Sequence, residues 1–151
     1  MSRTSSLRRQ HDAALRLAGE AQAIIDRIGA YPCDDNVFPL TMVLAKLTGT
    51  LRIHLAQEDR CLYPELMASG QGGVAATARQ FFEEMGQLAP QITGYSAKWL
   101  SSDAIIADWD GFRLDTAGIF SALSHRIACE NDILYPLADA LSEGAQAASA
   151  A

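Results

Sequence analysis

Apolar side chains recur every three or four residues through four long segments of this chain. No segment alternates apolar and polar residues for long enough to form a strand. Spacing by three or four places side chains on one face of an α-helix, whereas alternation places them on one face of a strand. The second segment shows the helical pattern well, with Leu40, Leu44, Leu47 and Leu51 in step. Each segment therefore predicts an amphipathic helix, and the chain predicts an all-α fold.

Clusters of Gly, Pro and capping residues separate the four segments. The predicted helices cover about residues 5–28, 34–67, 74–99 and 104–142, with Pro90 as a kink in the third and residues 101–103 as the cap of the fourth. Four long helices with short loops favour an up-down-up-down four-helix bundle. We expect one domain over residues 1–143, followed by a flexible tail over residues 144–151 that is rich in Ala, Gly and Ser.

Composition limits the classes of partner. The 151 residues suit about one domain, and 49% apolar residues suffice for one core. The formal net charge of −6 argues against nucleic acid and against an anionic membrane surface as the main partner. No apolar run reaches the ~18 residues of a membrane span. We also expect no signal peptide, because no apolar region follows the first basic residues.

The three cysteines, at positions 33, 61 and 129, form no C-x-x-C pair. An odd and sparse set of cysteines is typical of free thiols in a reducing compartment, which predicts a cytoplasmic location. Cys61 and Cys129 flank two glutamates and could respond to redox changes there. Packing as small apolar side chains is the favoured interpretation.

All three histidines lie on or near the apolar stripes. His54 and Glu58 are four residues apart on the stripe of the second helix, so their side chains point the same way. His11 is in step with the first helix's stripe, and His125 and Glu130 lie close to that of the fourth. A buried carboxylate without a partner is costly. Bundle cores that collect such residues from several helices commonly hold a metal.

Two of these histidines begin similar stretches. One reads His54-Leu-Ala-Gln-Glu-Asp-Arg-Cys-Leu-Tyr-Pro64 and the other His125-Arg-Ile-Ala-Cys-Glu-Asn-Asp-Ile-Leu-Tyr-Pro136. With Arg9-Gln-His-Asp-Ala-Ala-Leu of the first helix, the chain resembles the hemerythrin-like (HHE) cation-binding domain from about residue 5 to 142. The resemblance implies a four-helix bundle with a non-haem di-iron centre. It also implies a role in sensing or handling oxygen, nitric oxide or iron.

The resemblance implies a residue-by-residue ligand set. His11 and His54 would be terminal ligands of one metal, Glu58 and Glu130 would bridge, and His125 would be the terminal ligand of the second metal. Imidazole and carboxylate suit iron, with manganese or zinc as alternatives. Tyr63 and Tyr135 could donate hydrogen bonds to ligands, although packing at the bundle end is the favoured interpretation.

The third helix departs from the family pattern. It contains no histidine, and Phe82 stands where the family has one. Glu83 and Glu84 are adjacent and could substitute if the helix were rotated, but solvent-exposed glutamates are the favoured interpretation. The second metal would then lack part of its ligand set.

The fourth helix leaves a second question open. His125 and Glu130 are five residues apart, so they diverge by about 140° around a regular helix. Counted back from the Tyr-Pro pair, Arg126 and not His125 corresponds to His54. Either His125 is a ligand, or Arg126 forms a buried ion pair with Glu130.

These departures predict a partly degenerate site that holds one ion, two ions or none. We expect a metal-binding module for oxygen, nitric oxide or iron, with a metal-free helical interaction protein as the alternative. An enzyme is disfavoured, because the sequence shows no open coordination position and no access route. Any signal would pass through a separate protein partner or a homodimer.

Overall fold

The computed structural model describes residues 2–150, and all regular secondary structure in this range is helical. The helices are α1 (Ser5–Ile28), α2 (Asp34–Gln57), α3 (Tyr63–Met67), α4 (Gly72–Met85), α5 (Leu88–Lys98), α6 (Ser102–Ala107), α7 (Trp109–Cys129) and α8 (Tyr135–Ala150). Two π-helical turns, η1 (Glu58–Leu62) and η2 (Glu130–Leu134), join α2 to α3 and α7 to α8.

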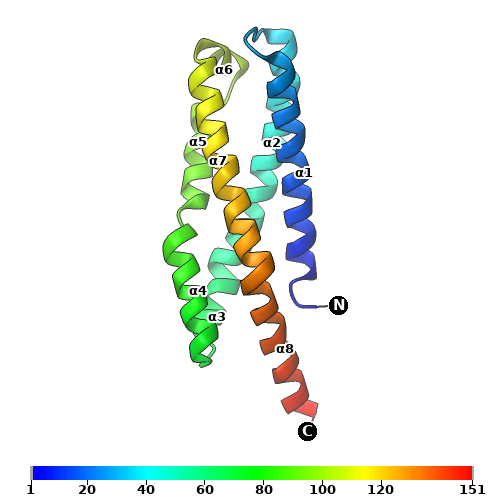
Figure 1. Cartoon of the computed structure of the whole chain (residues 1–151), viewed down its shortest axis with the longest axis vertical. Coiled ribbons are helices and arrows are strands. Elements are labelled where there is room, and N and C mark those ends of the chain that lie inside the picture. Colours follow the sequence, from blue (N-terminus) through cyan, green and yellow to red (C-terminus); the bar gives the residue numbers. More distant parts are fainter. Residues whose placement is uncertain (1, 151) are drawn as a thin grey trace.

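The elements form four long helical arms that run alternately up and down (Figure 1). The first arm is α1, the second is α2 with η1 and α3, the third is α4 with α5, and the fourth is α7 with η2 and α8. The short α6 lies at the upper end between the third and fourth arms. The predicted all-α, up-down-up-down bundle is confirmed.

The arms begin and end near the predicted breakers. Gly29 follows α1 with a φ of +61°, a conformation that favours glycine. Asn36 accepts a 2.8 Å hydrogen bond from the backbone of Cys33 at the start of α2. Ser101 accepts from the Ala104 backbone as predicted, but it caps the short α6. The long α7 has its own cap, because Asp108 accepts from the Gly111 backbone at 3.1 Å.

The third arm is interrupted earlier than predicted. The break lies at Gly86 and Gln87, between α4 and α5, and not at Pro90. Pro90 is the third residue of α5, where a backbone N–H has no intrahelical partner, so proline is tolerated. At Gly86 a Cβ atom would lie 2.3 Å from the Phe82 carbonyl oxygen, so this junction excludes any side chain.

The expected flexible tail over residues 144–151 begins inside α8, which continues to Ala150. Alanine has the highest helix propensity, and residues 145–148 contain three of them. Ala151 lies outside the described residues.

Three apolar clusters fill the bundle, and one buried polar layer lies beside the lower cluster. Trp99, Trp109 and Phe112 belong to the upper cluster, Leu51, Leu55 and Ile127 to the middle one, and Leu62, Leu134 and Phe81 to the lower one. In the sequence, the polar layer lies between Leu51 and Leu62 in the second arm and between Leu123 and Leu134 in the fourth. It contains His11, His54, Glu58, Arg126 and Glu130, all buried.

None of the helices within residues 2–150 is long and apolar enough to cross a bilayer.

Candidate metal centre

Four buried side chains from three arms converge in the polar layer. His11 comes from α1, His54 from α2, Glu58 from η1 and Glu130 from η2. Each offers one potential ligand atom, and these four atoms lie within 4.8 Å of one another. The side chains are at most 3% exposed. Two imidazole nitrogens and two carboxylate oxygens at this separation form a candidate site for one metal ion.

A π-helical turn joins each glutamate of the site to the tyrosine five residues after it. In each turn the backbone N–H of the tyrosine donates to the glutamate carbonyl five residues earlier: Tyr63 to Glu58, and Tyr135 to Glu130. Proline follows each tyrosine, has no N–H to donate, and displaces the carbonyl four residues before it. The repeated Tyr-Pro pair therefore favours a wider turn at these two places.

Two amide side chains set the orientation of the histidine rings. His54 Nδ1 lies 2.6 Å from Gln10 Oε1, and His11 Nδ1 lies 2.7 Å from Asn131 Oδ1. An amide oxygen only accepts, so both Nδ1 atoms carry the proton and donate. The amide nitrogen of Gln10 donates to Gln57 at 3.3 Å, which fixes the amide in this orientation. Both Nε2 atoms consequently face the carboxylates.

His54 Nε2 is the buried polar atom that best fits a bound cation. It lies 3.0 Å from Glu58 Oε1, yet it has no hydrogen-bond partner. In a ring with its only proton on Nδ1, Nε2 would present its lone pair to a carboxylate oxygen. Two electron-rich atoms at this distance repel one another unless a cation lies close to both. The donor set thus fits a metal ion.

Arg126 reaches the same two carboxylates from the fourth arm. Its Nε donates to Glu130 Oε2 at 3.0 Å, and one terminal nitrogen donates to Glu58 Oε1 at 3.3 Å and to Asp59 Oδ1 at 2.8 Å. The other terminal nitrogen donates to the Met85 carbonyl at 3.2 Å. Burial would lower the pKa of Arg126, but the charges of Glu130 and Glu58 outweigh it and raise the pKa, so the guanidinium stays charged.

The structure does not bring His125 to the cluster. Its side chain is exposed, and its Nε2 lies 3.8 Å from Cys129 Sγ on the same helix. Arg126 is the inward residue because it lies four positions before Glu130, which places both side chains on one side of the fourth arm. Of the two alternatives from the sequence, the structure therefore shows the buried ion pair between Arg126 and Glu130.

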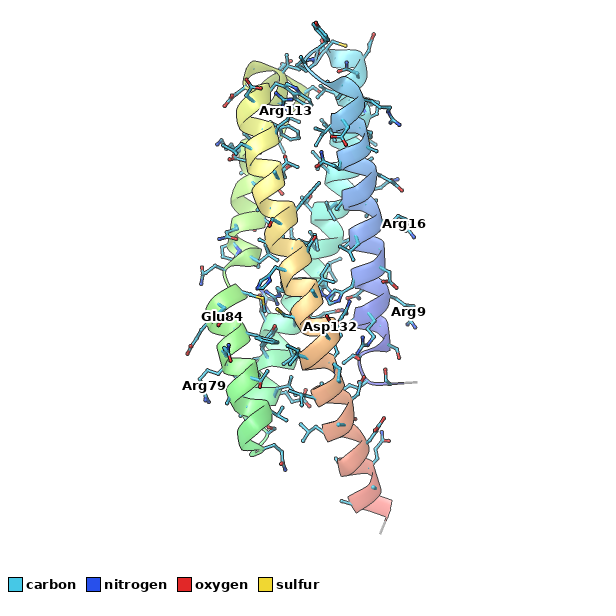
Figure 2. All side chains as sticks on the ribbon, viewed as in Figure 1. Arg9, Arg16, Arg79, Glu84, Arg113 and Asp132 are labelled. Carbon is cyan, nitrogen blue, oxygen red and sulfur yellow. The ribbon has the colours of Figure 1, made fainter. Side chains whose placement is uncertain are left out.

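The third arm sends no carboxylate to the site. Glu83 and Glu84 are exposed, and Glu84 points away from the bundle in Figure 2. Phe82 is 38% exposed, and its ring centroid lies 5.8 Å from that of Tyr63. Phe81 occupies the buried stripe in its place. The favoured interpretation of the two glutamates as solvent-exposed is confirmed.

Both tyrosines bind the carboxylates and do more than pack. Tyr63 donates to Glu130 Oε2 at 2.8 Å, and Tyr135 donates to Glu58 Oε2 at 2.5 Å. The pKa of each hydroxyl is raised, first by burial and then by the neighbouring carboxylates, so both remain protonated donors. Every carboxylate oxygen in the cluster therefore has a partner.

The charges within the layer shift two further groups. Burial lowers the pKa of His11, but the hydrogen bonds to Glu130 and Asn131 and the charge of Glu130 outweigh it and raise the pKa. Burial raises the pKa of Glu58, whereas His54 and the Arg126 guanidinium lower it, and the net shift is downward. Without a metal, a proton on His11 balances part of the negative charge, and a metal would compete with that proton.

Sequence reasoning missed three participants. Gln10 and Asn131 each stand next to a ligand in the sequence, and Asp59 follows Glu58 directly. Polar residues adjacent to predicted ligands were the available signal. Outer residues of this kind fix the tautomer of a ligating histidine.

Comparison with known proteins agrees with the site. The family described as the Hemerythrin HHE cation binding domain matches residues 2–138. No curated protein and no solved structure matches the chain. The matched range contains the first three arms, the fourth arm as far as residue 138, and every residue of the buried cluster. The chain therefore belongs to the hemerythrin HHE cation-binding domain family.

Proposed function

We propose that this domain binds one divalent metal ion, iron in the first place, through His11, His54, Glu58 and Glu130. The observation that carries the proposal is the unpartnered, buried Nε2 of His54 beside Glu58. Nitrogen and carboxylate ligands suit iron, and manganese and zinc accept the same set. A bound iron would supply an open position for a small diatomic ligand, and the domain would sense or handle oxygen, nitric oxide or iron.

The chain's own residues prepare this site. Gln10 and Asn131 hold both rings with Nε2 toward the carboxylates. The two tyrosines hold the second oxygen of each glutamate, which limits rotation of the carboxylates. Burial excludes bulk water, so the cluster is arranged before a metal arrives.

We propose that the domain works in the cytoplasm and passes its signal to a partner. The three cysteines are all free, which supports a reducing, cytoplasmic location. A change at the metal would reach a separate protein partner or a second copy of the chain through movement of the arms.

A metal-free interaction protein is the second candidate. It is favoured by Arg126, which already pairs with Glu58 and Glu130 and offsets part of their charge. If ion pairs and protonated histidines satisfy the layer completely, no metal is needed for folding or function.

Anaerobic titration of the purified protein with Fe²⁺ separates the two candidates. We expect one tightly bound ion per chain, and none in His54→Ala. The matched control is His125→Ala, which removes an exposed histidine and should bind one ion as the native protein does. Absence of binding by the native protein would favour the metal-free candidate. Two tightly bound irons per chain would contradict the single-ion site.

A further inference from the structure

We infer that the Arg126 guanidinium fills a second cation site built from four oxygen atoms, and that it thereby limits the centre to one metal ion. The inference rests on the proposed function and extends it, because it concerns what sets the number of ions. The cation in this second site is part of the chain.

The four oxygens come from three parts of the bundle. They are Glu58 Oε1 and Asp59 Oδ1 from η1, Glu130 Oε2 from η2, and the Met85 carbonyl oxygen at the end of α4. Their distances to the guanidinium nitrogens are 2.8–3.3 Å. Arg126 is 1% exposed, so the contacts are made away from water.

The Met85 carbonyl is available because of the helix break. The carbonyls in the last turn of a helix have no intrahelical partner, and α4 ends at Met85. The third arm, which provides no side-chain ligand, thus provides a backbone oxygen.

Three carboxylates and one carbonyl form the kind of oxygen set that hard divalent cations prefer, Mn²⁺ and Mg²⁺ among them. A guanidinium in their place cannot lose its charge in a protein. A divalent ion cannot enter the same space, and it would be repelled by the fixed positive charge. The guanidinium of Arg126 therefore stays bound to these four oxygens and excludes a divalent ion from them.

The charge of the layer agrees with one metal ion. The three carboxylates carry a formal charge of −3, and Arg126 reduces this to −2. One divalent ion beside neutral histidines balances that remainder. Two divalent ions beside the guanidinium would leave a buried charge of +2, which is costly.

A cavity links this second site to the surface. It has a volume of about 190 Å³ and lies where α4, α5 and α7 meet, lined in part by Glu84, Met85, His125 and Arg126. An ion from solution could reach the oxygens by this route if the arginine were removed.

The test compares four proteins in Mn²⁺ titrations that are measured by isothermal calorimetry. They are the native protein, Arg126→Ala, Arg126→Gln and the charge-preserving control Arg126→Lys. We expect one Mn²⁺ per chain for the native protein and the lysine variant, and two for the alanine and glutamine variants. In Arg126→Ala, a further Asp59→Asn substitution should weaken the second ion about tenfold or more, because it removes one charged oxygen.

The outcomes distinguish the two proposals. If the native protein binds no metal, the proposed function fails. If it binds one ion and both neutral variants also bind one, only the role of Arg126 fails. If both neutral variants unfold without metal, we expect excess Mn²⁺ to restore their circular dichroism. Failure of that rescue while Arg126→Lys folds would also overturn the inference.

Discussion

The hydroxyl of Tyr135 donates a 2.5 Å hydrogen bond to Glu58, and Tyr63 makes the corresponding contact to Glu130 at 2.8 Å. Each glutamate is thus bound by the tyrosine of the opposite arm. The pairs are buried, and the raised pKa of each tyrosine hydroxyl keeps it a donor. The two contacts join the second and fourth arms at the level of the candidate metal centre.

Tyr135→Phe should destabilise the metal-free protein by about 1.5–3 kcal/mol, because it leaves a buried carboxylate oxygen without its donor. The control is Tyr95→Phe, which removes a 2.7 Å contact to the neutral hydroxyl of Thr116 and should cost about 0.5–1.5 kcal/mol. Urea denaturation monitored by circular dichroism measures both. Equal losses of unfolding free energy in the two variants would show that the Tyr135–Glu58 hydrogen bond stabilises the protein no more than the Tyr95–Thr116 one.

Gln10→Leu should weaken metal binding about 10–100-fold, because the ring of His54 loses the partner that fixes its tautomer. Gln22→Leu is the matched control on α1, since Gln22 makes only an exposed contact with Asp26. Isothermal titration with Fe²⁺ or Mn²⁺ gives the affinities. An unchanged affinity in Gln10→Leu would remove Gln10 from the site.

Stability of the metal-free protein should fall as the pH rises above 6.5. The pKa of His11 is raised above 6.5 in the folded state, so folding favours the protonated ring. That contribution is fully present below 6.5 and is lost as the pH passes through the raised value. Urea denaturation at several pH values measures the slope. His11→Gln should flatten it, whereas His125→Gln, which changes an exposed side chain, should leave it unchanged.

Removal of the metal should lower the stability measured near neutral pH. At a free metal concentration of 100 times the dissociation constant, binding to the folded state alone adds about 2.7 kcal/mol. Thermal denaturation with and without a chelator reports the difference, and His54→Ala should show none. A native protein that melts identically with and without chelator would argue against bound metal.

The sequence predicted the arms, and it placed His54 and Glu58 on one buried face, because both depend on local spacing. His54 and Glu58 are one helical turn apart, which fixes their common direction whatever surrounds them. The end of the first arm at Ile28 likewise follows from Gly29 directly after it. These properties are encoded within a few neighbouring residues.

Other features depend on contacts between arms and could not be predicted. Spacing within the fourth segment left open whether His125 or Arg126 turns inward, because the answer depends on how α7 packs against the second arm, where Arg126 meets Glu58 and Asp59. Ile133 lies in the π turn that begins at Glu130, which changes the register of the residues after it, and its side chain is 47% exposed. The tyrosine contacts cross from one arm to another, so no spacing within one segment reveals them.

The break after α4 has a consequence for how substitutions should be tolerated. The third arm contributes to the buried layer through the main-chain oxygen of Met85, which every amino acid possesses. Exchanges at the exposed positions 83 and 84 should therefore leave the layer intact. A one-residue deletion there would move the oxygen away from Arg126 while preserving every side chain of the layer. At these exposed positions, the length of the helix is constrained more strongly than the identity of the residues.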